Sequence, residues 1–145
     1  MKKVGIVIAS TLVLAGGVVA PSALGSKGAA SVGPKVSVQI KTLTKTLLKA
    51  TTVQGQKGWI TKGGTPSGKC SAASGAGALN AATHGKWAGG YDKGLGIFVT
   101  SILGVKPPSK NDFWEILINN KPSNFGICGI KLHAGEKLLF KIAKG

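Results

Sequence analysis

The feature that most constrains the fold is the stretch 113–142, where large apolar side chains alternate with polar ones in two runs. Alternation with a period of two predicts β-strands with one buried face. In the first run one face collects Trp114, Ile116 and Ile118, opposite Phe113, Glu115 and Leu117. In the second run the shared face collects Leu138, Phe140 and Ile142. The C-terminal part of the chain is therefore predicted to supply strands of a sheet.

The segments between these strands carry turn residues. Asn119 and Asn120 fit a tight hairpin turn, because asparagine tolerates positive φ. Pro122 suits a short edge strand, where its missing N–H is not needed by a neighbour. A kinked connection is predicted at 126–129 and another turn at 134–136. The stretch contains no nucleophile, metal cluster or phosphate loop, which favours a binding surface over a catalytic centre.

The N-terminus has the pattern of a secretory signal peptide. Lys2 and Lys3 precede an almost wholly apolar run at 4–20, and Gly25 suits a cleavage position. A retained membrane anchor is the alternative, but ~17 apolar residues are marginal for a span. We predict a cleaved signal peptide at 1–25, a flexible lead-in at 26–34 and a single folded domain at 35–145. The product is expected to be a secreted monomer, extracellular or associated with the cell surface.

The chain contains two cysteines, Cys70 and Cys128. An exported chain meets an oxidising compartment, so we expect them to form a disulfide. The two cysteines are 58 residues apart. Closing a loop of that length constrains the unfolded chain by about 4 kcal/mol, a large share of a small domain's stability. Reactive or metal-binding cysteines are the alternatives. Neither cysteine has a histidine at a zinc-ligand spacing, so no metal site is predicted.

Lysine dominates the charge of the chain. There are 19 lysines, no arginine and four carboxylates, giving a net charge of +15, or +13 once Lys2 and Lys3 are removed. Such a field attracts polyanions such as cell-wall polymers or anionic lipid surfaces. The lysines are spread along the chain, and without arginine no bidentate contact to phosphate or guanine is available. A basic binding surface and an evenly solvated one both fit, and specific nucleic-acid binding is not predicted.

The rest of the chain predicts further strands and one helix. Strands are expected at 36–41, 47–53, 59–61 and 97–103, a turn-rich loop at 63–68, and a loop at 85–96. A short helix is expected at 72–83, with Ser71 or Ser74 as its N-cap and Gly85 just past its end. This order of elements predicts an α+β fold, a small mixed sheet with one helix across it.

The layout resembles the bacterial secreted family named for its likeness to the C-terminal domain of transcobalamin, a domain of unknown function. The matching residues, in order, are 47–48, 51–53, 70–71, 77–79, 82–83, 87, 96–99, 102–104, 113–114, 119–120, 126–128 and 132–140. The resemblance covers nearly all of the chain from Val36 to Ile142, and it rests on the order and spacing of these residues together.

The resemblance implies a β-grasp-like fold of a kind that holds soluble ligands. In transcobalamin and intrinsic factor the corresponding domain closes over one face of cobalamin, so cobalamin is a ligand implied by resemblance alone. This sequence has no counterpart of the large helical domain that forms the other half of the cobalamin site. Members of the family keep two cysteines at the positions of Cys70 and Cys128, which supports their pairing.

No catalytic residue is predicted. The two histidines, His84 and His133, are expected at the end of the helix and in a solvated turn. The four carboxylates, Asp92, Asp112, Glu115 and Glu136, form no spaced acid pair. No metal-binding motif is present. The chain is therefore predicted to be a binding protein and not an enzyme.

The aromatic residues offer two interpretations. Five of them, Trp59, Trp87, Tyr91, Phe113 and Trp114, either fill the core or line a surface on which a ligand stacks. Trp87 and Tyr91 are the best ligand candidates, since they are predicted to lie in a Gly-rich loop beside Lys86 and Lys93. We predict a secreted domain that binds a soluble ligand or a cell-envelope component. The alternative is a cationic protein held on anionic surfaces by its lysines.

Overall fold

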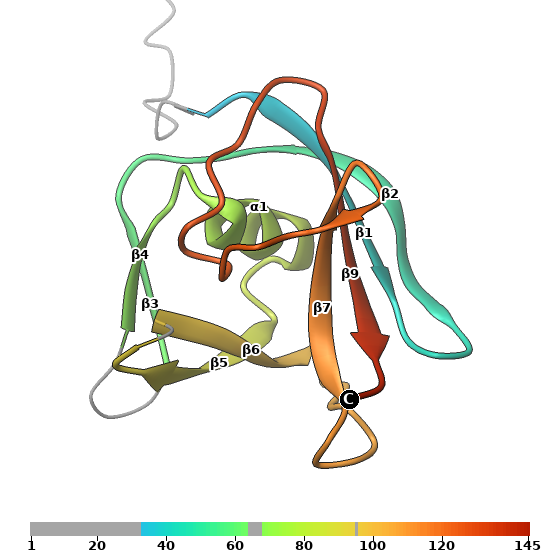
Figure 1. The fold of residues 1–145 in the computed structure, drawn as a ribbon. Helices are drawn as coiled ribbons and strands as arrows, with labels where there is room; N and C mark the ends of the chain where they lie inside the picture. The colour runs from blue at the N-terminus through green and yellow to red at the C-terminus, as the bar shows by residue number, and fades with distance from the viewer. Residues whose placement is uncertain (1–32, 64–67, 95) are drawn as a thin grey trace, which may run out of the picture.

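The fold is described from a computed structural model, for residues 33–63, 68–94 and 96–145 (Figure 1). The predicted signal peptide at 1–25, most of the lead-in at 26–34 and most of the loop at 63–68 lie outside the described residues. Gly33, near the end of that lead-in, is buried, and its N–H donates to the carbonyl of Gly55. Ordered packing therefore reaches at least two residues upstream of the first strand.

A five-stranded mixed sheet forms one side of the molecule (Figure 1). Its strands are β1 (Lys35–Lys41), β2 (Thr46–Gln54), β7 (Phe113–Ile118), β8 (Lys121–Pro122) and β9 (Lys137–Ala143). They lie in the order β2-β1-β9-β7-β8, and β1 runs parallel to β9 while the other neighbours are antiparallel. The last strand of the chain thus lies at the centre of the sheet, between the first strand and the hairpin of β7 and β8.

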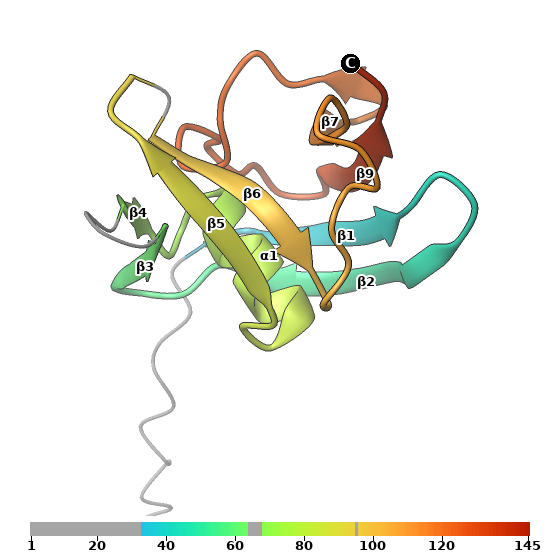
Figure 2. The ribbon, with the colours of Figure 1, turned by 90° about the horizontal axis from the view of Figure 1, so that it is seen from below.

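A helix packs against this sheet, and two antiparallel pairs of strands lie beside the helix (Figure 1). They are α1 (Gly75–Thr83), the pair β3 (Trp59–Lys62) and β4 (Gly68–Ser71), and the pair β5 (Trp87–Asp92) and β6 (Gly96–Ile102). Helix α1 contacts β1 and β2 on one side and β5 on another. Figure 2 shows the β5–β6 hairpin crossing in front of the helix. The predicted α+β fold with one disulfide is confirmed, and α1 is the helix found in the described residues.

The core lies between the five-stranded sheet and α1. It is built from the faces that alternation predicted, because every second side chain of a strand points to the same side. Val36, Val38 and Ile40 of β1 and Leu138, Phe140 and Ile142 of β9 are all buried. Trp114 is buried with them, and Ile116 and Ile118 pack against the same cluster. Leu79 of α1 is fully buried against this sheet.

The predicted turns are confirmed. Asn119 and Asn120 both have positive φ, 51° and 67°, and connect β7 to β8 as a tight hairpin. Pro122 lies in β8, the edge strand of the sheet. Ser74 is the N-cap of α1, and its side chain accepts a hydrogen bond from the N–H of Ala76. The helix therefore begins three residues later than predicted, with Ser74 and not Ser71 as its cap.

Two predictions in the middle of the chain were wrong. Residues 87–92, predicted as part of a loop, form strand β5. The loop prediction rested on Gly89 and Gly90, but both stand where a side chain has no room: a Cβ at Gly89 would lie 2.7 Å from Ile97, and one at Gly90 would meet the ring of Phe98. Strand β6, predicted to be buried, has only Ile97 and Ile102 buried in its described residues.

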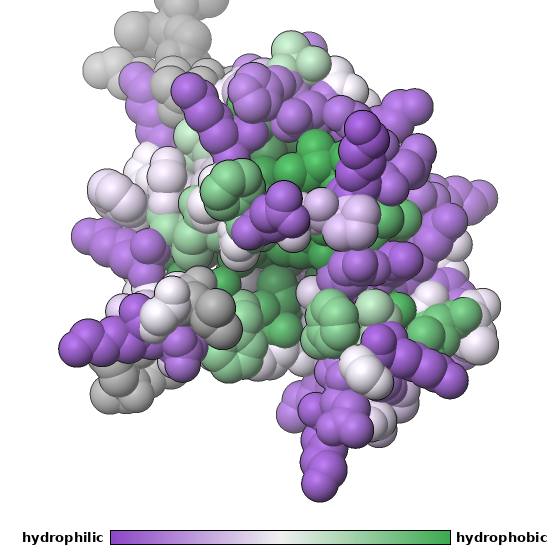
Figure 3. Space-filling model, viewed as in Figure 1, coloured by the Kyte–Doolittle hydropathy of each residue, from purple (hydrophilic) through white to green (hydrophobic). Residues whose placement is uncertain are grey.

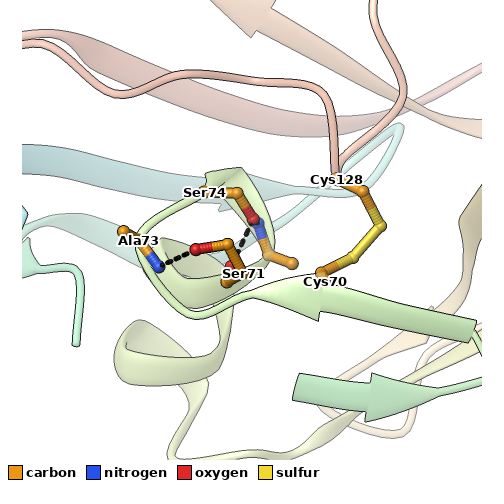
Figure 4. The surroundings of a disulfide bond; sticks show 6 residues. Cys70, Ser71, Ala73, Ser74 and Cys128 are labelled. Atoms are coloured by element: carbon orange, nitrogen blue, oxygen red, sulfur yellow. Dashed lines mark hydrogen bonds between the residues drawn. A yellow bond between two sulfur atoms is a disulfide. The ribbon is translucent and has the colours of Figure 1, made fainter. Parts of the chain in front are cut away.

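The Cys70–Cys128 disulfide is present and joins β4 to the segment between β8 and β9 (Figure 4). The Cα atoms of the two cysteines are 5.1 Å apart. Beside it, the N–H of Ala73 and the hydroxyl of Ser74 donate to the side chain and carbonyl of Ser71. The bridge therefore links the residues just before α1 to the segment that carries Ile127.

Candidate functional site

The structure separates the four residues predicted to bind a ligand. Trp87 is only 5% exposed and lies in the core. Its indole N–H donates to the side-chain oxygen of Asn80 at 3.1 Å, and the ammonium of Lys62 lies 5.2 Å from its ring centroid. Lys62 also donates to the carbonyls of Gly85 and Trp87. Trp87 therefore packs in the core, and a ligand contact by its ring stays a prediction.

We expect Lys62→Met to lower the free energy of unfolding by about 1–2 kcal/mol, because two half-buried carbonyls lose their donor and the Trp87 ring loses its cation. Lys69→Met is the matched control. Its ammonium lies 5.0 Å from the ring of Trp59, which is exposed, so the change should stay within about 0.5 kcal/mol. Urea unfolding of both variants measures the difference, and equal effects would contradict the assignment.

The other three predicted residues lie at the surface. Tyr91 is partly exposed on β5 and lies against the β3–β4 hairpin, because a Cβ at Gly68 would lie 2.8 Å from its ring. Lys86 and Lys93 are exposed at opposite ends of β5. None of these three residues lines the two hollows described below. A ligand contact by these three residues stays a prediction.

A different set of aromatic residues forms a cleft between β6, β7 and the segment that follows β8. We call it the aromatic cleft. Its rim carries three exposed rings, Phe98 at 46%, Phe113 at 48% and Phe125 at 66%. Its floor includes the buried Trp114 and Ile127, and its volume is about 320 Å³. Figure 3 shows apolar side chains gathered in the middle of this face, with hydrophilic ones around them.

The backbone holds two of these rings in place. The ring of Phe98 lies over Gly90, its cross-strand partner in β5, where a methyl group would collide with it. Phe125 is held through Ser123, whose hydroxyl accepts from the Phe125 N–H at 3.1 Å and donates to the Phe125 carbonyl at 3.0 Å. The N–H of Ser123 in turn donates to Ile116 of β7. The rim is thus attached to the sheet.

Trp114, which lines the cleft, carries a polar group that is unpaired among the described residues. Its indole N–H is buried and has no hydrogen-bond partner within the described part of the chain. Buried donors are nearly always paired, so an unpaired one marks a place where a water or another acceptor is expected. Glu115 is the charged residue that lines the cleft, and its carboxylate pairs with Lys141 at 3.0 Å. Apart from Glu115 and Ser123, the residues that line the cleft are apolar.

A basic groove of about 360 Å³ continues from the cleft. The two hollows share Phe98, Val99 and Phe113, so they are neighbours along β6. The groove adds the loop that follows β6, with the lining residues Lys106, Pro107, Ser109, Lys110 and Asp112. Both lysines are exposed. Aromatic rings and cations therefore line two neighbouring hollows.

Sequence reasoning missed Phe98 and Phe125. Phe98 points outward from β6, and its neighbour Ile97 points inward and is buried. The apolar run at 97–103 predicts a strand that is buried along its whole length, so it hides this exposed ring. Phe125 follows Pro122 in a short polar segment, which is a weak signal for an exposed aromatic anchor. The cleft brings together residues 97–99, 113–116 and 122–127, and no local pattern indicates that these segments meet.

The histidines and carboxylates of the described residues do not gather into a candidate metal site. No group of three or more His, Cys, Asp and Glu side chains in this part of the chain could hold a metal ion. His84 ends α1 in a left-handed conformation, as its predicted position implied. His133 is exposed, and its Nδ1 lies 3.0 Å from Glu136. Among the described helices, none has the length and apolar character needed to span a bilayer.

Comparison with known proteins agrees with the resemblance seen in the sequence. From Gly75 at the start of α1 to Lys144, the chain matches the family described as Domain of unknown function (DUF4430). This match covers 70 of the 145 residues, so the C-terminal half of the chain is similar to a domain of unknown function. No curated protein matches it in sequence.

Several solved structures share the fold, two of which are compared with the chain as follows. Haptocorrin, in a crystal structure of its complex with Cbi, superposes with a TM-score of 0.58 and 16% identity over 79% of this chain. This chain spans only 26% of haptocorrin. The second is a candidate metal-binding protein from Ruminococcus gnavus ATCC 29149, with a TM-score of 0.54 and 12% identity. That match covers 77% of this chain and 98% of the other.

Proposed function

We propose that this protein is a secreted, non-enzymatic domain that binds a soluble small molecule in the aromatic cleft. The observation that carries the proposal is the convergence of three exposed phenylalanines on one hollow with a buried apolar floor. Soluble proteins bury large apolar side chains wherever they can, so a concave cluster of exposed rings indicates a binding site. The complex of haptocorrin with Cbi supports a ligand-binding use of this fold.

Export is part of the same proposal. The N-terminal pattern of Lys2, Lys3 and the apolar run at 4–20 supports it. The Cys70–Cys128 disulfide agrees with an oxidising compartment outside the cytoplasm. A binding domain that leaves the cell would meet its ligand in solution or at the cell envelope.

The neutral fluorophore N-phenyl-1-naphthylamine tests the cleft. We expect it to bind one site on the folded protein, with an affinity that does not change between low and high salt, because the probe carries no charge. Phe98→Ser combined with Phe125→Ser should weaken binding at least tenfold, since each ring removes apolar area worth more than about 1 kcal/mol. Trp59→Ser is the control, because it removes an equally exposed aromatic ring away from the cleft.

Two results would count against the proposal: no saturable binding of the probe, or equal binding by the double phenylalanine variant and the wild type. Thermal unfolding of the same samples shows whether the variants are folded, and little change is expected because both rings are exposed. Binding that occurs only to anionic polymers and disappears at high salt would instead favour a protein held by its lysines.

A further inference from the structure

The basic groove places two lysines next to the aromatic cleft. It shares Phe98, Val99 and Phe113 with the aromatic cleft, so a molecule stacked on those rings has Lys106 and Lys110 at one end. Within the described residues, neither lysine has an ion pair or a hydrogen bond from its ammonium group. Two cations without a protein partner beside an apolar hollow are electrostatically complementary to an anionic group.

The loop that carries these lysines is held in a fixed direction. Leu103 and Gly104 both have positive φ, 50° and 79°, and make a tight reversal at the end of β6. Ile102 and Val105 exchange two backbone hydrogen bonds across that reversal, at 3.0 and 2.9 Å. Pro107 and Pro108 then stiffen the chain between the two lysines. A pre-organised loop loses less entropy when a ligand binds than a flexible one does.

Asp112 is the acidic group on the same groove, and it limits the number of anionic charges that the groove can accept. The two lysines against one carboxylate leave a net charge of about +1 in this region, which suits a single anion better than a polyanion. The apolar cleft, by contrast, contains Glu115, which is already paired with Lys141. The two hollows therefore differ in character: the aromatic cleft is mainly apolar, and the basic groove is cationic.

We infer that the natural ligand is a soluble anionic amphiphile, a molecule with a flat apolar body for the aromatic cleft and one carboxylate, sulfonate or phosphate for Lys106 and Lys110. This inference rests on the proposed function and adds the class of ligand. It commits to a free small molecule and not to a lipid surface, because the rings line a hollow that a flat bilayer would not fill.

A matched pair of fluorophores tests this inference. 1-Anilinonaphthalene-8-sulfonate is N-phenyl-1-naphthylamine with an added sulfonate, so comparing the two isolates the contribution of the anion. We expect the wild type to bind the sulfonate form about tenfold more tightly at low salt, equivalent to about 1.4 kcal/mol. In Lys106→Gln/Lys110→Gln that preference should fall about five- to tenfold, while binding of the neutral probe changes less than twofold.

The control variant is Lys49→Gln/Lys57→Gln, which removes the same charge from exposed positions that line neither hollow. It should keep most of the preference for the sulfonate. Equal losses in the two double variants would overturn the inference, because the effect would then come from net charge alone. In that case binding of the neutral probe would still support the proposed function, whereas no binding of either probe would refute both.

A second test uses vesicles of phosphatidylcholine with one quarter phosphatidylglycerol to examine binding to a lipid surface. The inferred ligand predicts that the wild type stays in the supernatant when such vesicles are sedimented at physiological salt. Sedimentation of the wild type but not of Lys106→Gln/Lys110→Gln would overturn the inference in favour of a lipid surface.

Discussion

Replacing both cysteines by alanine, in Cys70→Ala/Cys128→Ala, is expected to lower the free energy of unfolding by about 4 kcal/mol. The bridge closes a loop across 58 residues, so its loss frees the unfolded chain far more than the folded one. For a domain of this size the melting temperature should fall by on the order of 15 °C. Urea unfolding and thermal unfolding, each followed by circular dichroism, measure the two quantities.

The folded state should survive the loss of the bridge because other contacts hold the same segments together. The N–H of Gly75 donates to the Ile130 carbonyl, and the N–H of Ala76 donates to the Ile127 carbonyl, at 3.1 and 3.2 Å. Ile127 and Ile130 are themselves buried. We therefore expect an unchanged native spectrum with a lower midpoint. A variant that unfolds at the wild-type urea concentration would show that the loop-entropy account is wrong for this chain.

The strands of the sheet could be predicted from sequence because their signal is local. In β1 and β9 every second residue is large and apolar, and these are the side chains that are buried. In β7 the alternation places Trp114 correctly, but Leu117 of the opposite face is buried as well, and Ile116 and Ile118 are only half-buried. The turn at Asn119 and Asn120 is equally local, since asparagine accepts the positive φ that the turn requires. Strands β1 and β9 were therefore predicted with the correct faces, and β7 only in part.

Strand β5 and the aromatic cleft could not be predicted in this way, because their causes lie elsewhere in the chain. Gly89 and Gly90 are typical of a loop when seen alone, and only Ile97 and Phe98 across the hairpin explain them. The cleft needs Phe98, Phe113 and Phe125 to meet, and the tertiary fold brings them together. A site near Trp87 stays a prediction, but the ring of Trp87 itself lies in the core because residues 87–92 form a strand and not a loop.

Gly77 tests whether packing or helix propensity governs α1. Alanine at an interior helix position is favoured over glycine by about 1 kcal/mol, so propensity alone predicts that Gly77→Ala is stabilising. We expect the opposite, a loss of about 2–3 kcal/mol, because a Cβ at Gly77 would collide with the carbonyl group of Ala72. That carbonyl cannot easily move away. It accepts from the N–H of Gln56 at 3.0 Å, and the N–H of Ala72 donates to Gly58 at 2.9 Å.

Gly129→Ala is the matched control for this prediction. A Cβ there would lie 3.4 Å from its nearest neighbour, the Cβ of Phe125, which is ordinary van der Waals contact. Its effect should stay within about 0.5 kcal/mol, so urea unfolding of the two alanine variants separates the collision from the general effect of losing a glycine. If Gly77→Ala were neutral or stabilising, α1 would have room to move away from β4, and the close approach of the helix to Ala72 would not be what fixes its position over the sheet.

A shift of α1 should also reach the floor of the aromatic cleft. The Cys70–Cys128 bridge joins the residues just before this helix to the segment that carries Ile127, which lines the cleft. We therefore expect the folded Gly77→Ala variant to bind N-phenyl-1-naphthylamine more weakly than the wild type.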